Sequence, residues 1–334
     1  MTNIDETIRN IFPGKTVVIL GDLVADQFLN GTISRVSREA PVFILRHETT
    51  ETIPGAAANA AVNVASLGGR AKLVGLAGKD ANGCLLIDKL QAEGVDCGLV
   101  VSDTGFSTTT KVRVLAAQHY AARQQVIRID YENDAVISSE IEQKLRENFA
   151  EAAGSADAII VSDYNYGAVF PAIFDDARSM AADRGIPLIV DSRYRLAELS
   201  NATSATPNRE EVEQMLGKHF TADDCSRLRE TLSYQALLVT NGNQGMTLFE
   251  QDRPPRQFNV VGPPEPVDVT GAGDTVIAAY ALALASGLCF GDAATVANHA
   301  GGIVVMKKGT ASVKAAELLE SLNGASETAS VIAN

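Results

Sequence analysis

The chain has 334 residues, which is enough for one large α/β domain or for a domain with an appendage. Apolar residues make up 46% and charged residues 21%, a composition that excludes a disordered or collagen-like chain. The net charge of −13 gives no long-range attraction for nucleic acid or for anionic membranes, so we expect neither as a partner. An anionic substrate would therefore require positive charge that is built locally.

The sequence carries no sign of a metal-binding cysteine cluster or of a targeting segment. The four cysteines form no CxxC pair, so they predict neither a zinc site nor a disulfide framework. Residues 1–12 lack an apolar signal core. The longest apolar run, residues 276–285, is about half of the roughly 20 residues that cross a bilayer. We therefore expect a cytoplasmic protein.

Short apolar runs alternate with helical patterns along most of the chain. Such alternation predicts a doubly wound, mostly parallel sheet with helices on both faces. The runs that are typical of buried strands are residues 16–20, 71–76, 158–161, 188–190 and 237–240. The helical patterns are residues 57–67, 83–92, 171–184, 210–216 and 276–285.

Two segments interrupt this rhythm with strand-like alternation and no crossover helix, namely residues 27–52 and 107–130. We expect them to form a small antiparallel sheet that is inserted into the α/β body as a lid. No repeat or linker divides the remainder, so residues 1–334 are predicted to be a single domain. The unbroken apolar run 42–45 is hard to bury within a small lid, which predicts a homodimer through the lids.

The most informative motif is DVTGAGDT at residues 268–275, directly before the apolar run 276–285. Its small residues permit a sharp turn whose amides face an anion at a helix N-terminus. It is neither a Walker A loop nor GxGxxG, because no Gly-Lys-Ser/Thr follows and Val276 stands where the third glycine belongs. Asp274 is either a helix N-cap or a base that accepts the proton of an attacking hydroxyl, and the local sequence favours neither.

Two further segments combine small and polar residues. PGAAAN at residues 54–59 permits close backbone approach, and Asn59 offers both a donor and an acceptor to a hydroxyl. A small-residue helix packed tightly on the sheet gives the same pattern. GDLVAD at residues 21–26 follows the first strand, at the edge where open α/β sheets bind ligands. An aspartate at such a place is either a hydroxyl ligand or a turn residue.

Two later segments are compatible with a nucleotide site. In TPNREE, residues 206–211, Asn208 and Glu211 lie about one helical turn apart, so they can order Mg²⁺ waters and phosphates. The same residues also form a good helix start. TNGNQG, residues 240–245, follows a buried strand, and its Asn-Gly pair is first of all a turn signal.

With these motifs the chain resembles the ribokinase-like (PfkB) sugar kinases from residue 16 to about residue 314. The resemblance implies the ribokinase-like fold and transfer of the γ-phosphoryl group of ATP to a sugar hydroxyl, with Mg²⁺ and activation by K⁺. It implies that Asp274 is the base and that the backbone of Gly271, Ala272 and Gly273 forms the anion hole. It further implies sugar-binding Asp26, Gly55 and Asn59; nucleotide-binding Asn208, Thr240, Gly242, Gly245 and Asn298; Glu211 on Mg²⁺ through water; and Asp268, Thr270 and Gly309 on K⁺.

Within this family, residues 21–26, 34–42 and 108–114 are most similar to the heptose 7-phosphate kinases, which phosphorylate the anomeric hydroxyl. Basic side chains near the predicted lid either supply charge for an already phosphorylated sugar or are solvent-exposed strand charges. These residues are Arg35, Arg38, Lys111, Arg113 and Arg128, of which Lys111 and Arg113 are the predicted substrate ligands. No nucleotidyltransferase domain follows, so the resemblance implies a kinase without adenylyl transfer.

Some positions depart from the heptose kinase pattern. Ala56 stands where the family has a second glycine, Tyr166 stands where a lysine is usual, and Arg193 replaces a lysine. Residues 118–122 resemble an insertion between two lid strands. Since these changes lie where the substrate is read, a PfkB kinase for fructose, ribose or ketodeoxygluconate and a non-catalytic sugar or nucleotide sensor remain alternatives. A nicotinamide dehydrogenase is disfavoured because its fingerprint is lacking.

Overall fold

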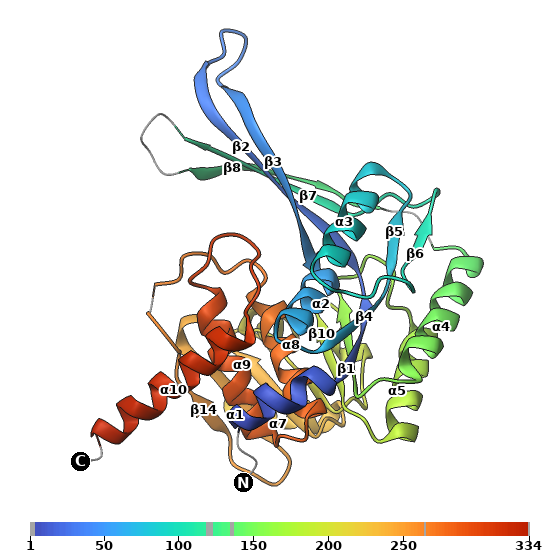
Figure 1. Cartoon of the computed structure of the whole chain (residues 1–334), viewed down its shortest axis with the longest axis vertical. Coiled ribbons are helices and arrows are strands. Elements are labelled where there is room, and N and C mark those ends of the chain that lie inside the picture. Colours follow the sequence, from blue (N-terminus) through green and yellow to red (C-terminus); the bar gives the residue numbers. More distant parts are fainter. Residues whose placement is uncertain (1–3, 118–122, 134–136, 264, 333–334) are drawn as a thin grey trace.

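The structure is a computed structural model that describes residues 4–117, 123–133, 137–263 and 265–332 (Figure 1). Its body is an eight-stranded sheet in the order β14-β13-β12-β11-β10-β9-β1-β4. All pairs from β4 to β12 are parallel, and only β13 and β14 are added antiparallel. The prediction of a doubly wound, mostly parallel sheet is confirmed.

The body sheet has five strands that follow the predicted apolar runs and three, β11, β13 and β14, that the sequence patterns did not indicate. They are β1 (Thr16–Gly21), β4 (Arg70–Val74), β9 (Ala158–Asp163), β10 (Leu188–Ser192), β11 (Ser204–Ala205), β12 (Ala236–Thr240), β13 (Met246–Glu250) and β14 (Arg256–Phe258). The predicted run 71–76 also reaches into β5 (Leu76–Gly78), which pairs with β6 (Val101–Asp103) in a separate small sheet.

Every predicted helix is present, as α2, α3, α5, α6 and α8. Four further helices of ten residues or more, α4, α7, α9 and α10, were not indicated by the sequence patterns. The helices are α1 (Ile4–Glu6), α2 (Ala57–Ser66), α3 (Ala81–Ala92), α4 (Ser139–Ala153), α5 (Pro171–Arg184), α6 (Arg209–Leu216), α7 (Ala222–Thr231), α8 (Ala272–Ala285), α9 (Phe290–Val304) and α10 (Ala315–Ile332). Short helical turns lie at Thr7–Ile11, Phe12–Gly14, Leu196–Glu198 and Gly242–Gln244.

Alternating residues of β1 show that both faces of the sheet are covered. Val17 and Ile19 pack into a core with α2, α8 and α9, whereas Val18 and Leu20 pack into a second core with α4, α5 and α7. All four side chains are fully buried. This explains why β1 is an unbroken apolar run, as expected for a central parallel strand.

A second sheet projects from the body as the lid (Figure 1). It consists of β2 (Leu23–Val36), β3 (Phe43–Ala56), β7 (Thr110–Ala117) and β8 (Gln124–Tyr131). The hairpins β2–β3 and β7–β8 are antiparallel, and the two hairpins are joined by parallel pairing of β2 with β7. Strand β2 begins at residue 23 and strand β3 ends at residue 56, so this hairpin extends beyond the predicted segment 27–52 at both ends. The predicted insertion at residues 118–122 lies outside the described residues.

Among the residues that the structure describes, no helix has both the length and the apolar character needed to cross a bilayer. The long apolar helix α8 is instead buried in the protein core, where it packs against α2 and α9.

Gly21 at the end of β1 offers a test of this packing. A Cβ atom at Gly21 would collide with the carbonyl oxygen of Ser162 on β9 and lie 2.9 Å from Cβ of Ala57. We expect Gly21→Ala to lower the free energy of unfolding by about 1–3 kcal/mol, measured by urea denaturation. Gly14→Ala is the control, because no atom lies within 4 Å of the added carbon. Equal stabilities of the two variants would contradict the packing described here.

Candidate functional site

Two adjoining cavities open at the carboxyl edge of the body sheet. One is polar, with a volume of about 470 Å³, and the other is mainly apolar, with a volume of about 180 Å³. They share the walls formed by Thr240, Val269, Ala272 and Gly273. In the sheet, β4 lies on one side of β1 and β9 lies on the other, so the strand order reverses at β1. Such a topological switch point is the usual ligand site of open α/β sheets, and the polar cavity lies near it.

Asp274 lies buried in the first turn of α8, at the wall of the polar cavity. The N-cap of α8 is Gly271, so the helix begins four residues earlier than predicted and the N-cap interpretation of Asp274 is wrong. Its carboxylate accepts two side-chain hydrogen bonds. Asn59 Nδ2 donates to Oδ2 at 2.8 Å and the Tyr164 hydroxyl donates to Oδ1 at 3.0 Å.

The electrostatic surroundings of Asp274 are unusual for a carboxylate. Burial raises its pKa to about 7, and the nearby carboxylates of Asp191 and Asp26 act in the same direction. The hydrogen bonds from Asn59 and Tyr164 oppose the shift but do not cancel it. A buried carboxyl group in a cavity that gains and loses a proton near neutral pH is typical of a catalytic acid or base.

The glycine turn before α8 presents backbone amides beside this carboxylate. Gly271 has φ of 77°, and a Cβ atom there would lie 2.5 Å from Asn59 Nδ2, so the turn requires glycine. The Ala272 amide donates to the carbonyl of Val269 at 3.2 Å. Within the described part of the chain, the amides of Gly271 and Gly273 donate to no acceptor. Two of the three amides predicted as an anion hole are thus available to a ligand.

Asn59 takes a different place from the one predicted. It does not line the polar cavity, and its Nδ2 group donates both to Asp274 and to the carbonyl of Gly271, the latter at 3.3 Å. Its Oδ1 accepts from Asn63 Nδ2 at 3.1 Å. Because α2 packs directly against α8, Asn59 lies behind the carboxylate rather than in front of it. It is therefore engaged with protein groups instead of being free to bind a sugar hydroxyl.

Asp26 and Gly55 lie side by side at the base of the lid. Asp26 is buried, lines the polar cavity and forms an ion pair with Arg113. A Cβ atom at Gly55 would lie 2.5 Å from Asp26 Oδ2, so the glycine makes room for the carboxylate rather than lining the cavity itself.

Four basic side chains line the polar cavity, namely Lys111, Arg113, Arg128 and Arg193. Arg113 is paired with Asp26, and Arg128 is paired with Asp130. Lys111 and Arg193 have no carboxylate within ion-pair distance among the described residues. These two cations are thus the ones available to an anionic ligand.

The remaining basic residues singled out in the sequence do not reach this cavity. Arg35 lies exposed near the far end of β2, and Arg38 lies exposed in the turn that follows β2. For these two arginines the interpretation as solvent-exposed charges is the correct one.

Two positions that depart from the heptose kinase pattern have defined surroundings. The Tyr166 hydroxyl donates to Glu132 Oε1 at 2.8 Å, and its ring lies 5.4 Å from the ammonium group of Lys111. Tyr166 therefore contacts the lid strand β7 through Lys111 and the residue that follows β8. Ala56 lines the polar cavity with φ of 55°, a conformation that glycine adopts more easily.

Asn208 and Glu211 form a reciprocal capping box at the start of α6. Asn208 Oδ1 accepts from the Glu211 amide at 3.0 Å, and Glu211 Oε2 accepts from the Asn208 amide at 2.8 Å. Both side chains also line the polar cavity, together with Asp191 at the end of β10. Burial raises the pKa of both Asp191 and Glu211. The charge of Glu211 raises the pKa of Asp191 further, and the charge of Glu210 raises that of Glu211. Paired carboxylates that repel each other beside a cavity fit a divalent cation.

Three residues predicted at a monovalent-cation site lie close together. Asp268 Oδ1 accepts from the Thr270 amide at 2.9 Å, and Asp268 Oδ2 accepts from the Gly309 amide at 3.0 Å. These bonds join the loop before α8 to the loop before α10. The arrangement brings the three predicted residues together beside the glycine turn.

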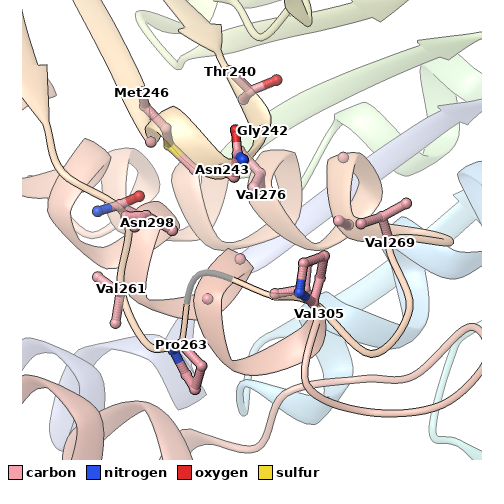
Figure 2. A pocket seen from close by; sticks show the side chains of 17 residues that line it. Thr240, Gly242, Asn243, Met246, Val261, Pro263, Val269, Val276, Asn298 and Val305 are labelled. Atoms are coloured by element: carbon pink, nitrogen blue, oxygen red, sulfur yellow. The ribbon is translucent and has the colours of Figure 1, made fainter.

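The apolar cavity contains most of the residues predicted to bind a nucleotide (Figure 2). Thr240, Gly242, Gly245 and Asn298 line it, with valine, methionine and proline side chains completing the walls. Asn298 Nδ2 donates to the carbonyl of Asn259 at 2.7 Å, which fixes the amide at the edge of the cavity. An apolar cavity with a few polar groups in its wall suits a purine base. The fifth residue, Asn208, lines the polar cavity instead.

The family model for pfkB family carbohydrate kinases matches residues 15–316. The chain belongs to this family. The bifunctional protein HldE of Caulobacter vibrioides is 40% identical over 315 residues, which cover 92% of this chain and 63% of that protein. The chain thus spans less than two thirds of the length of this relative.

Two solved kinase structures share the fold of this chain. Arabidopsis thaliana ribokinase, complexed with ribose and ATP, superposes with a TM-score of 0.70 at 23% identity, covering 92% of this chain and 98% of the ribokinase. Phosphofructokinase-2 from Escherichia coli, in complex with potassium, superposes with a TM-score of 0.72 at 20% identity, covering 92% and 97% of the two chains.

Two residues of this pfkB chain lie at the site although the sequence analysis assigned them no role. Tyr164 donates to Asp274, and Asp191 faces Glu211. Tyr164 directly follows β9, and Asp191 is the next-to-last residue of β10, so their position at the carboxyl edge of the sheet was the signal that pointed to them. Sequence spacing alone does not tell which strand ends meet around one cavity.

Proposed function

We propose that this chain transfers the γ-phosphoryl group of ATP to a hydroxyl group of a phosphorylated sugar, with a heptose 7-phosphate as the acceptor. One observation carries the kinase assignment. A buried carboxylate, Asp274, lies beside the open amides of Gly271 and Gly273 at the point where an apolar and a polar cavity meet. This arrangement suits a reaction in which a proton is removed where negative charge develops.

The proposed transfer is in line. The acceptor hydroxyl gives its proton to Asp274 while its oxygen forms a bond to the γ-phosphorus. The bond from that phosphorus to the bridging oxygen breaks, and ADP leaves with the electron pair. The amides of Gly271 and Gly273 donate to the oxygens of the transferring group, whose charge they stabilise.

The remaining walls suit the other parts of the two substrates. The adenine ring would occupy the apolar cavity beside Asn298, and the phosphates would extend toward Thr240 and the glycine turn. Mg²⁺ near Glu211 and Asp191 would neutralise phosphate charge, and K⁺ near Asp268 would support the turn. Asp191 and Glu211 suit the divalent ion, whereas Asp268, whose two carboxylate oxygens accept backbone amides, would hold the loops around K⁺.

The proposal of an anionic acceptor rests on the unpaired cations of the polar cavity. In a chain with a net charge of −13, Lys111 and Arg193 supply local positive charge where the sugar would lie. The heptose assignment is supported by the similarity of residues 21–26, 34–42 and 108–114 to heptose 7-phosphate kinases. Asp26 would accept a hydrogen bond from a sugar hydroxyl at the base of the lid.

We also propose that the chain forms a homodimer through its lids. Val36, Val42 and Phe43 near the end of the β2–β3 hairpin are 57%, 54% and 55% exposed. Further apolar side chains of β8, namely Val126, Ile127 and Ile129, are also exposed. A second lid that covers this surface would bury apolar area which a single chain leaves in water.

Asp274→Asn tests the assigned base. We expect kcat to fall by about 10³-fold, because the amide cannot accept the hydroxyl proton, while ATP affinity and stability change little. ADP release with ATP, Mg²⁺, K⁺ and heptose 7-phosphate is the measurement. Asp292→Asn is the control, since Asp292 has the same position in the first turn of α9 but lines neither cavity. Substantial activity of Asp274→Asn would refute the assignment.

Lys111→Met tests the anionic acceptor. Loss of a charged contact of about 1.5–3 kcal/mol predicts at least a tenfold rise in KM for heptose 7-phosphate, with KM for ATP unchanged. Lys218→Met, an exposed position away from both cavities, is the control. ADP release by the parent protein is also measured with fructose, fructose phosphates, ribose and ketodeoxygluconate as acceptors. Turnover on one of these alone rejects the heptose assignment, and ligand binding without turnover on any sugar identifies a sensor.

The proposed dimer is tested by light scattering on a sizing column at micromolar concentration. We expect twice the 35.2 kDa mass of the chain. Phe43→Lys should yield the monomer because a charge would be buried in the interface. Leu85→Lys, which alters an exposed apolar side chain on α3 outside the lid, should remain dimeric. A monomeric parent protein would refute the proposal.

A further inference from the structure

The loop that follows β9 delivers a tyrosine hydroxyl to the buried carboxylate of Asp274. Tyr164 donates to Oδ1 at 3.0 Å, while Asn59 on α2 donates to Oδ2 at 2.8 Å. Each carboxylate oxygen thus has one donor, and the two donors come from separate elements. Since a carboxylate has about four acceptor positions, room remains for the proton of a substrate hydroxyl.

The position of Tyr164 is fixed by a second carboxylate. Buried Asp22, directly after β1, accepts from the amide of Tyr164 at 2.8 Å and from that of Tyr166 at 3.0 Å on Oδ2. Its Oδ1 accepts from the amide of Ala168 at 2.9 Å. These three bonds hold the loop against the end of β1, so Tyr164 is directed to Asp274 by the backbone.

The orientation of Asn59 is fixed in the same manner. Asn63, one turn later on α2, donates to Asn59 Oδ1 at 3.1 Å, which directs the Nδ2 group of Asn59 to Asp274. The Asp274 carboxylate is therefore held between two donors that are themselves held in place. Such support keeps a reactive group within the narrow range of positions that proton transfer requires.

The groups around Asp274 determine whether its carboxyl group is protonated or ionised. Burial and the facing carboxylates of Asp191 on β10 and Asp26 on β2 favour the protonated form, whereas the bonds from Asn59 and Tyr164 favour the ionised form. Burial also raises the pKa of Tyr164 well above its usual value, so its hydroxyl remains a donor at every relevant pH. A protonated Asp274 cannot accept the proton of a hydroxyl.

We propose that Tyr164 is a positioning residue of the transfer reaction, whose hydroxyl, opposite the Asn59 amide, holds the Asp274 carboxylate ionised and aimed at the polar cavity. The inference rests on the proposed function, because it takes Asp274 to be the base. It assigns Tyr164 no contact with the substrate. Asp22 acts one step further away, through the loop that carries Tyr164.

Tyr164→Phe removes only the hydroxyl and is tested by the pH dependence of kcat/KM. Activity of the parent protein should fall below about pH 7, where Asp274 gains a proton. In Tyr164→Phe this acid limb should move upward by about one pH unit, so that activity at pH 7 is about fivefold below that of the parent protein and recovers at about pH 9. A purely structural role would instead lower activity equally at every pH.

Tyr166→Phe is the matched control for the position of the acid limb. It removes a hydroxyl from the same loop, but that hydroxyl donates to Glu132 rather than to Asp274. Its acid limb should coincide with that of the parent protein. The inference is overturned if the acid limb of Tyr164→Phe stays in place or if both variants shift it equally.

A titration without substrate separates this inference from the proposed function. Carboxyl ¹³C NMR of aspartate-labelled protein, with the Asp274 signal assigned by Asp274→Asn, follows protonation directly. We expect the titration midpoint to rise by about one pH unit in Tyr164→Phe and to stay unchanged in Tyr166→Phe. An unchanged midpoint in Tyr164→Phe overturns the inference even if the enzyme is active. If no acceptor is turned over, the proposed function fails. The NMR titration still shows whether the Tyr164 hydroxyl stabilises the ionised form of Asp274.

Discussion

The contact between Asn59 on α2 and the start of α8 is the constraint on which the two cavities depend. Gly271 turns the chain through a left-handed conformation against the Asn59 side chain, and the same amide group binds Asp274 in the first helical turn. The carboxylate and the open glycine amides are therefore parts of one rigid backbone segment. Because α8 is buried along almost its whole length, this segment cannot shift without disturbing the core.

Aspartates at the same sheet edge have different surroundings and therefore suit different tasks. Asp22 is enclosed and accepts three backbone amides, which suits the bracing of a loop. Asp274 accepts two side-chain donors and keeps a side toward the polar cavity, which suits proton transfer. Asp191 has a raised pKa through burial and the neighbouring Glu211, which suits a cation. The three residues are all aspartates, so their hydrogen-bond donors, burial and neighbouring charges decide which task each one suits.

The distribution of charge divides the polar cavity between the lid and the body. Lys111, Arg113 and Arg128 come from the lid strand β7 and its partner β8, whereas most of the carboxylates come from the ends of the body strands and from α6 and α8. A strongly acidic protein thus places three of the four basic side chains of the polar cavity on two lid strands. Tyr166 links the two parts, because it lies on the body loop and contacts Lys111 and Glu132.

The sequence by itself determined the alternation of strands and helices, the inserted lid and the glycine turn before α8, since each depends on local periodicity or on small residues. It did not determine that α8 begins at residue 272, which made Asp274 a first-turn residue rather than a cap. Nor did it determine that Asn59 lies behind Asp274 and Tyr164 beside it. These contacts join residues 215 and 110 positions apart, so only the order of strands and the packing of α2 on α8 decided them.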